Sequence, residues 1–323
     1  MIVEREFNKL VQASESIIIF SHVNPDGDTL GSMLALSEFI NLNYKKSTTN
    51  VIIGKTPTTY SFLSKINSCK LNTEIDKNFK YDLAIAVDIA AKDRMTDMQP
   101  VYFNAKNTIN IDHHVTNNGY GNINIVKPDA SSCGEVVYEL IKTLNLDLNK
   151  EIAELLYVAI LTDTGGFKYE NTSNKVFEYA AELVEYGVNP TELYRKCYEE
   201  KPKAMALLNA YAISNTIFKE NDKIAYSILT KDDMKKFNAK SDYTDGISEA
   251  LRQISSTEIA MLLKEADNQT TKVSLRSKNI DVAKIAEHFG GGGHKYAAGC
   301  TIQKPPKIAI EKILEIVKRE LND

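Results

Sequence analysis

The sequence predicts an α/β protein with an N-terminal parallel-sheet domain, a helical linker and a smaller C-terminal α/β domain. The chain has 323 residues, which suits two domains better than one. Short apolar runs alternate with helical patterns, as is typical of parallel sheets covered by helices. A polar helical stretch interrupts this alternation, so we place the three parts at 1–189, 190–220 and 221–323.

Short apolar runs in the N-terminal domain predict buried strands. These runs lie at 17–20, 51–54, 83–87 and 108–111. Longer segments that place apolar residues on one side predict helices. These segments lie at 1–12, 29–42, 131–144, 151–162 and 174–186. We therefore expect a parallel sheet with helices on both faces.

The linker, from about 190 to 219, has a helical pattern, and we expect no strand in it. In the C-terminal domain the alternation of strand and helix patterns resumes. We expect strands at 224–229, 258–263 and 271–276, and helices at 280–288 and 308–321.

The overall charge argues against a protein that coats long nucleic acid. The formal net charge is −4 and the isoelectric point is about 5.9, whereas such binding depends on many Lys and Arg contacts to phosphates. A small anionic substrate held by a few well-placed cations remains compatible with this charge.

The four cysteines, Cys69, Cys133, Cys197 and Cys300, are far apart and form no CxxC pair. This spacing argues against a zinc knuckle or a disulfide framework and suits a reducing compartment. The first residues are charged and amphipathic, unlike a signal peptide. No apolar run approaches the length of a membrane span. We therefore expect a soluble cytoplasmic protein.

Acidic and histidine residues fall where predicted elements end. In open α/β sheets, ligands bind beyond the carboxyl ends of the strands, so side chains at these positions are expected to meet. The loop 22–28 has Pro, Asp and Gly residues that suit a tight turn. The side chains expected to converge are His22, Asp26, Asp28, Asp88, Asp112, His113, His114 and Asp163.

Any one of these residues alone fits a turn residue, a helix N-cap or a hydrogen-bonded structural histidine. Together they would repel one another strongly unless a cation neutralised them. Hard carboxylate ligands with two imidazoles and no thiolate favour Mn²⁺ or Mg²⁺, with Co²⁺ as a substitute in vitro, over a structural zinc. One bridging carboxylate would allow two ions about 3.5–4 Å apart, which can flank a phosphorus atom.

Five segments in this order carry a family resemblance: 22–28, Asp88, 112–114, 163–166 and 290–294. Together they resemble the DHH/DHHA1 phosphoesterase family, in particular its nanoRNase (oligoribonuclease) and 3′-phosphoadenosine-5′-phosphate phosphatase type. The resemblance spans 21–299 and implies a DHH domain followed by a DHHA1 domain.

The resemblance implies a role for each residue of the cluster. His22 and Asp26 would bind the first metal ion, and Asp88 would bridge both ions. The ligands implied for the second ion are Asp28, His113 and Asp163. Asp112 would orient the neighbouring imidazole. His114 would face the substrate phosphate and donate a proton to the leaving oxygen, although a structural hydrogen bond is the alternative reading.

The glycine run before His294 lets the backbone approach a ligand closely, and a helix starting after it would favour an anion. With the segment 274–277 it resembles the substrate-binding part of a DHHA1 domain. The substrate contacts implied are His294, Arg276, Gly291, Gly292 and Gly293. Weaker candidates, because exposed basic residues are mostly solvated surface and a Tyr is mostly packing, are Arg252, Lys264, Arg94 and Tyr296.

The resemblance implies hydrolysis of very short oligoribonucleotides to mononucleotides, and of 3′-phosphoadenosine 5′-phosphate to AMP. Alternatives in the same superfamily are a phosphodiesterase for linear or cyclic dinucleotides and an inorganic pyrophosphatase. A RecJ-like exonuclease is disfavoured, because no OB-like strand array for tracking a long strand is expected. A nucleotide-binding module without turnover does not need a bridging carboxylate, and a purely structural role is least favoured. We expect no membrane partner, and a homodimer fits the family.

Overall fold

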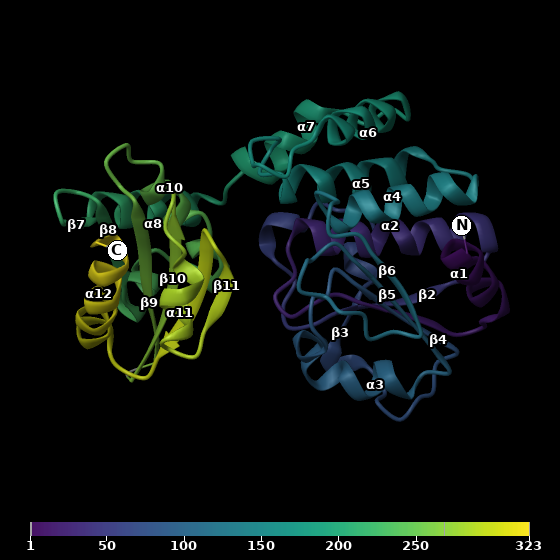
Figure 1. Ribbon diagram of the computed structural model, residues 1–323, viewed down its shortest axis with the longest axis horizontal. Helices are drawn as coiled ribbons and strands as arrows, with labels where there is room; N and C mark the ends of the chain where they lie inside the picture. The colour runs from purple at the N-terminus through teal and green to yellow at the C-terminus, as the bar shows by residue number, and fades with distance from the viewer. Residues whose placement is uncertain (1, 268, 323) are drawn as a thin grey trace. The chain divides into compact units, whose positions relative to one another are not determined.

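The computed structural model describes residues 2–267 and 269–322, without the side chains of His294 and Asn322. The chain forms two compact units, Met1–Glu200 and Lys201–Asp323, and each is built on its own six-stranded sheet (Figure 1). None of the helices in the described residues is long and apolar enough to cross a membrane.

The sheet of the first unit is parallel throughout, with the order β3-β2-β1-β4-β5-β6. Its strands are β1 (Ile17–Phe20), β2 (Thr48–Ile52), β3 (Lys70–Leu71), β4 (Leu83–Val87), β5 (Asn107–Asp112) and β6 (Ile123–Val126). The chain runs outward from β1 to β3 and then returns to β4 on the other side of β1. The strand order therefore reverses between β1 and β4, which is where ligands bind in open α/β sheets.

Helices cover both faces of this sheet, with α2, α4 and α5 on one side and α3 on the other (Figure 1). The helices are α1 (Ile2–Ala13), α2 (Gly27–Tyr44), α3 (Gln99–Asn104), α4 (Cys133–Leu144), α5 (Lys150–Asp163), α6 (Asn174–Glu185) and α7 (Pro190–Tyr194). Strand β1 is buried on both faces: Ile17 and Ile19 join one apolar cluster, and Ile18 and Phe20 join the other. A continuous apolar run is what a strand between two helical layers requires.

Helix α2 lies in the centre of its layer and is buried nearly all round. Its packing against α5 depends on Gly31, because a Cβ there would lie 2.6 Å from the carbonyl oxygen of Leu155. Asp26 caps the helix by accepting from the backbone N–H of Thr29. The capped N-terminus of α2 thus stands at the carboxyl end of β1.

Short 3₁₀ and π segments complete the first unit. The 3₁₀ segments are η1 (Thr58–Tyr60), η2 (Ile66–Ser68), η3 (Asn72–Glu74) and η4 (Lys92–Met98), and the π segment is η5 (Arg195–Glu199).

The second unit has a mixed sheet with the order β11-β12-β10-β9-β8-β7, in which only β8 and β9 pair in parallel. Its strands are β7 (Ile217–Lys219), β8 (Ile224–Leu229), β9 (Ile259–Asp267), β10 (Thr270–Ser277), β11 (Gly292–His294) and β12 (Ala297–Ile302). Its helical segments are α8 (Lys203–Ser214), α9 (Lys231–Lys236), η6 (Ser241–Thr244), α10 (Ile247–Arg252), α11 (Val282–Glu287) and α12 (Pro306–Asn322). One apolar cluster joins the sheet to α11 and α12, and another joins it to α8 and α10.

The predicted fold class is confirmed, with two corrections to the elements. The segment 190–219 was expected to lack a strand, but β7 lies within it; β7 is an exposed edge strand whose short sequence carries no alternation. The glycine run leads into β11 and β12, so in the described residues 290–302 strands follow it and not a helix N-terminus. Strands β3, β6, β11 and β12 escaped prediction because they are short or rich in small and polar residues.

Candidate metal centre

Side chains from four segments, 22–28, 88, 112–114 and 163, meet at the carboxyl edge of β1, β4 and β5. Three groups of carboxylate and imidazole side chains have potential ligand atoms within 4.8 Å of one another. The groups are His22, Asp26 and Asp88; Asp28, His113 and Asp163; and Asp88, Asp112, His113 and His114. The structure thus brings together all eight residues that the sequence predicted to converge.

Asp88 lies between the first two groups. Its Oδ2 is 3.6 Å from Nε2 of His22, and its Oδ1 is 3.6 Å from Nε2 of His113. Oδ2 also accepts a hydrogen bond of 2.5 Å from the Thr29 hydroxyl. Oδ1 is buried and has no hydrogen-bond partner among the described residues. Because an unpartnered buried carboxylate oxygen is costly, this atom is suited to a cation.

The backbone at Asp88 adopts the left-handed region, with φ of +58°. Non-glycine residues adopt this region at a cost, and such positions cluster at functional sites. Here the turn follows directly after β4 and leaves the Asp88 side chain 4% exposed. The left-handed backbone at Asp88 therefore directs its carboxylate into the cluster.

Two imidazoles present the same ring nitrogen to the carboxylates. Nδ1 of His22 lies 2.9 Å from the carbonyl oxygen of Val23, and Nδ1 of His113 lies 3.3 Å from that of Ala130. A carbonyl accepts only from an N–H, so Nδ1 carries the proton and Nε2 keeps its lone pair. Nε2 of His113 is 3.7 Å from Oδ2 of Asp163. Metal-binding histidines are oriented in this way.

Asp28 is held by the N-terminus of α4. Its carboxylate accepts hydrogen bonds from the backbone N–H groups of Cys133 (2.7 Å) and Gly134 (2.9 Å), and from the Ser32 hydroxyl (3.0 Å). A helix N-terminus favours a negative charge. Burial nevertheless raises the pKa of Asp28 to about 6, although His113 opposes the shift.

The other carboxylates are also shifted upward. Burial raises the pKa of Asp163 to about 8 and that of Asp88 well above its usual range, and the neighbouring Asp28 adds to both shifts. Burial lowers the pKa of His22. For His113 burial acts in the same direction, but the nearby Asp28 and Asp163 outweigh it and raise its pKa. A divalent cation would relieve the repulsion that these shifts reflect.

Asp112 is fully buried and contacts His114. Its Oδ1 accepts from Nδ1 of His114 at 2.8 Å and from the backbone N–H of His113 at 2.9 Å. Its Oδ2 accepts from the Asn117 amide at 2.5 Å. Burial alone would raise the pKa of Asp112, but the hydrogen bond from His114 brings it below its usual value. Both oxygens are thus already engaged, so Asp112 holds an imidazole in place.

Sequence reasoning missed two residues of this site, Asn117 and Thr29. The Asn117 amide also donates to Asn110 and to the carbonyl oxygen of Ile89, and so connects the ends of β4 and β5. The only sequence signal for either residue is its closeness to a motif: Thr29 follows Asp28, and Asn117 follows His114 by three positions.

The donor set fits a hard divalent cation. Carboxylate and imidazole groups are the ligands that Mn²⁺ and Mg²⁺ accept. The nearby thiol of Cys133 is fully buried, its burial raises its pKa well above the usual range, and it donates to the carbonyl oxygen of Ile111. It is therefore a neutral packing group, and the cluster can hold metal through oxygen and nitrogen alone.

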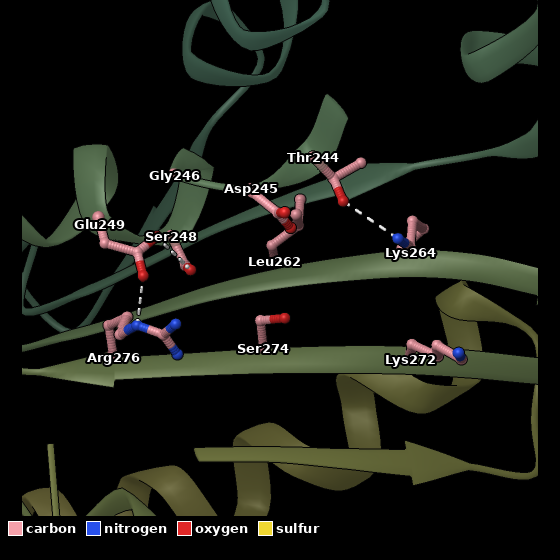
Figure 2. A pocket seen from close by; sticks show the side chains of 10 residues that line it. All are labelled: Thr244, Asp245, Gly246, Ser248, Glu249, Leu262, Lys264, Lys272, Ser274 and Arg276. Atoms are coloured by element: carbon pink, nitrogen blue, oxygen red, sulfur yellow. Dashed lines mark hydrogen bonds and ion pairs between the residues drawn. The ribbon is translucent and has the colours of Figure 1, made fainter. Parts of the chain in front are cut away.

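The candidate substrate contacts lie in different places. In the first unit Arg94 is exposed, and its positive charge contributes to the lowered pKa of His22. In the second unit Arg276 and Lys264 line a pocket of about 190 Å³ (Figure 2). Arg252 is not among the lining residues and donates at 3.4 Å to the carbonyl oxygen of Ser277.

The glycine run packs closely against strand β12. A Cβ on Gly291 would lie 2.2 Å from the carbonyl oxygen of Gly299, and one on Gly293 would lie 2.5 Å from that of Ala297, whereas Gly292 faces open space. For Gly291 and Gly293 the close approach in the structure is therefore to a neighbouring strand. The side chain of His294 lies outside the described residues. Tyr296 has the Lys295 ammonium over its ring.

Comparison with known proteins agrees with this arrangement. Residues 16–160 match the model of the DHH family, N-terminal domain, and residues 221–323 match that of the DHHA1 domain. The chain is 32% identical to the bifunctional oligoribonuclease and PAP phosphatase NrnA of Bacillus subtilis, over 92% of each chain. The chain belongs to the DHH family.

Two further relatives of this DHH-family chain extend the comparison. The protein of the same name from Thermus thermophilus is 31% identical over 94% of this chain and 90% of its own length. An exopolyphosphatase-related protein from Bacteroides fragilis shares the fold with a TM-score of 0.92 and 28% identity, over 100% of this chain and 98% of its own. The family model and the relatives both confirm the predicted family.

Proposed function

We propose that this chain is a two-metal phosphoesterase that hydrolyses very short oligoribonucleotides to mononucleotides and 3′-phosphoadenosine 5′-phosphate to AMP. The observation that carries the proposal is Asp88, whose two carboxylate oxygens each face a different group of ligands, one of them without a hydrogen-bond partner among the described residues. The relatives named as oligoribonuclease and PAP phosphatase support this choice of substrates.

In this proposal the group of His22, Asp26 and Asp88 and the group of Asp28, His113 and Asp163 would each hold one ion. His22 and Asp26 would hold the first ion, and Asp88 would contribute a carboxylate oxygen to each ion. The ligands of the second ion are Asp28, His113 and Asp163. Mn²⁺ is the proposed metal, with Mg²⁺ or Co²⁺ as substitutes, because carboxylates dominate the set. Two bound cations supply Lewis-acid activation of water and charge neutralisation at the phosphoryl oxygens.

His114 is the proposed proton donor to the leaving oxygen. Asp112 fixes the proton on Nδ1 of this imidazole, so Nε2 is the nitrogen that can serve the substrate when the ring is protonated. Arg94, whose charge acts on His22, is proposed to contact a substrate phosphate on the same unit. In the second unit Arg276 is proposed to contact another phosphate, since it lines a pocket with two lysines.

Other substrates of the superfamily, namely linear or cyclic dinucleotides and pyrophosphate, need the same phosphoryl chemistry. The relatives named as oligoribonuclease favour short RNA among these substrates. A cytoplasmic location is proposed because all four cysteines are free thiols. A homodimer stays a prediction.

The test is a time course with 5′-labelled RNA of two to ten nucleotides and Mn²⁺, run beside phosphate release from 3′-phosphoadenosine 5′-phosphate and assays with pyrophosphate and cyclic dinucleotides. We expect mononucleotides and inorganic phosphate from the first two substrates. The Asp88→Ala variant should lose both activities, whereas Asp147→Ala, at an exposed position outside the cluster, should keep them. Substantial turnover by Asp88→Ala would contradict the bridging role.

A further inference from the structure

The pocket of the second unit is lined by charged side chains on two sides (Figure 2). One side is strand β10, where Lys272, Ser274 and Arg276 alternate with the core residues Val273 and Leu275. Residues two apart on a strand face the same way, so these three side chains form a polar stripe with a cation at each end. This stripe suits a phosphate.

The opposite side of the pocket carries two carboxylates and, at the end near Thr244, the ammonium group of Lys264. The carboxylates, of Asp245 and Glu249, lie in the turn and first residues of α10 (Figure 2). Glu249 is already engaged, because it accepts from Nε of Arg276 at 2.5 Å and from the Ser248 hydroxyl at 3.1 Å. The Asp245 carboxylate makes no hydrogen bond within the described part of the chain, and Asp245 as a whole residue is exposed.

Among the described residues, the neighbouring cations form no ion pair with the Asp245 carboxylate either. Lys264 donates to the carbonyl oxygen of Ser241 at 2.8 Å and to the Thr244 hydroxyl at 3.0 Å. It lies near enough to lower the pKa of Asp245, but desolvation prevails and raises that pKa to about 6. Asp245 is therefore ionised at neutral pH, and an ionised carboxylate is an acceptor only. A ligand group that binds to it therefore has to be a donor.

The size of the cavity decides which part of a nucleotide fits. Its volume of about 190 Å³ is below the ~300–1,000 Å³ of sites that enclose a whole drug-sized ligand. A phosphate on β10 and the sugar attached to it would take up much of this volume, which would leave the base outside. The sugar groups that donate hydrogen bonds are the ribose hydroxyls, and acidic residues bind such hydroxyls in other nucleotide sites.

We infer that Asp245 is a specificity-determining residue that accepts hydrogen bonds from the ribose hydroxyls of the nucleotide whose phosphate lies on β10. The inference rests on the proposed function and deepens it. The 2′-hydroxyl is the group that distinguishes RNA from DNA, so the pocket selects ribonucleotides without reading the base.

The experiment measures binding of AMP, 2′-deoxy-AMP and inorganic phosphate to the full-length Mn²⁺-loaded protein by calorimetry. The wild type should bind AMP about tenfold more tightly than 2′-deoxy-AMP, as expected for a hydrogen bond to a charged acceptor. Asp245→Ala should lose this preference and keep its affinity for phosphate. Lys272→Ala should weaken AMP and 2′-deoxy-AMP equally, which places the bound phosphate in this pocket.

Two variants guard against a structural explanation. Asp232→Ala, at an exposed position on α9, should leave all three affinities unchanged. Asp245→Asn keeps the shape and one acceptor, so it should retain part of the preference for AMP. Thermal melting of each variant confirms that it folds.

Equal binding of AMP and 2′-deoxy-AMP by the wild type, no binding of AMP, or an unchanged preference in Asp245→Ala would each overturn the inference. The proposed function fails in a different assay, the hydrolysis time course, if the wild-type protein hydrolyses neither RNA nor 3′-phosphoadenosine 5′-phosphate. AMP is not cleaved in the binding assay, so the two failures are distinct.

Discussion

The carboxylate and imidazole cluster of the first unit and the pocket of the second unit differ in how their charged side chains are held. In the cluster, buried carboxylates are fixed by protein donors, as the two backbone N–H groups and the Ser32 hydroxyl that donate to Asp28 illustrate. In the pocket, an accessible carboxylate and cations share a small cavity, and Asp245 lacks such donors in the described residues. The fixed carboxylates of the cluster suit metal ions, which need ligands in a defined geometry. The pocket suits a ligand with an anionic group at one end and hydrogen-bond donors at the other.

The largest effect is expected from Asp88→Asn. The amide has the shape of the carboxylate but lacks the charge that two cations would share. Loss of an outer partner of a metal ligand typically costs 10–100-fold, so loss of the bridging ligand should reduce kcat by more than about a hundredfold. Hydrolysis assays and Mn²⁺ titration by calorimetry check this, with circular dichroism to confirm the fold. If the variant keeps full Mn²⁺ affinity, Asp88 is not a metal ligand, and the cluster of the first unit is not the metal site.

Asp112→Asn should have the next largest effect. Asp112 keeps His114 in orientation through its Nδ1, so we expect kcat to fall about 10–100-fold and the pH profile of kcat to change. Because both Asp112 oxygens are engaged by protein donors, Mn²⁺ affinity should change little. If Mn²⁺ affinity falls as far as in Asp88→Asn, Asp112 is a ligand and not a positioning residue.

The two regions also differ in how far the sequence predicts them. His22, Asp88 and His113 follow parallel strands, and the ends of such strands meet at one edge, so their convergence follows from chain order. Their binding of metal stays a prediction. The contacts of Thr29 and Asn117 depend on how loops fold and leave no pattern. In the sequence, an isolated acidic residue such as Asp245 cannot be distinguished from solvated surface. Its place in a pocket follows only from the structure.

The response of stability to Mn²⁺ should depend on pH. In the metal-free protein the pKa values of Asp28 (about 6) and Asp163 (about 8) exceed those of the unfolded chain. The folded state then holds more protons, so its stability falls as pH rises from about 4 towards 8. Mn²⁺ needs the deprotonated carboxylates and binds more tightly in the same direction.

We therefore expect the increase in melting temperature on adding Mn²⁺ to be larger at pH 8 than at pH 5.5, measured by scanning calorimetry. Asp163→Asn removes one of the shifted carboxylates and should flatten the pH dependence of the metal-free protein. An equal increase in melting temperature at both pH values would show that these carboxylates do not bind the ion. The cluster would then not differ from the pocket in binding metal.

The smallest effect is expected from Glu249→Gln. Glu249 holds Nε of Arg276, and both side chains are partly exposed. An ion pair of this kind contributes at most about 1 kcal/mol, which is about fivefold in an equilibrium constant. We expect KM for a ribodinucleotide to rise by up to about fivefold and kcat to stay the same, because Glu249 positions a binding group and not the reacting atoms. Glu287→Gln, at an exposed position of the same unit, is the matched control. A fall in kcat comparable to that of Asp112→Asn would show that the pocket takes part in the chemical step, and the two regions would then have to be treated as one site.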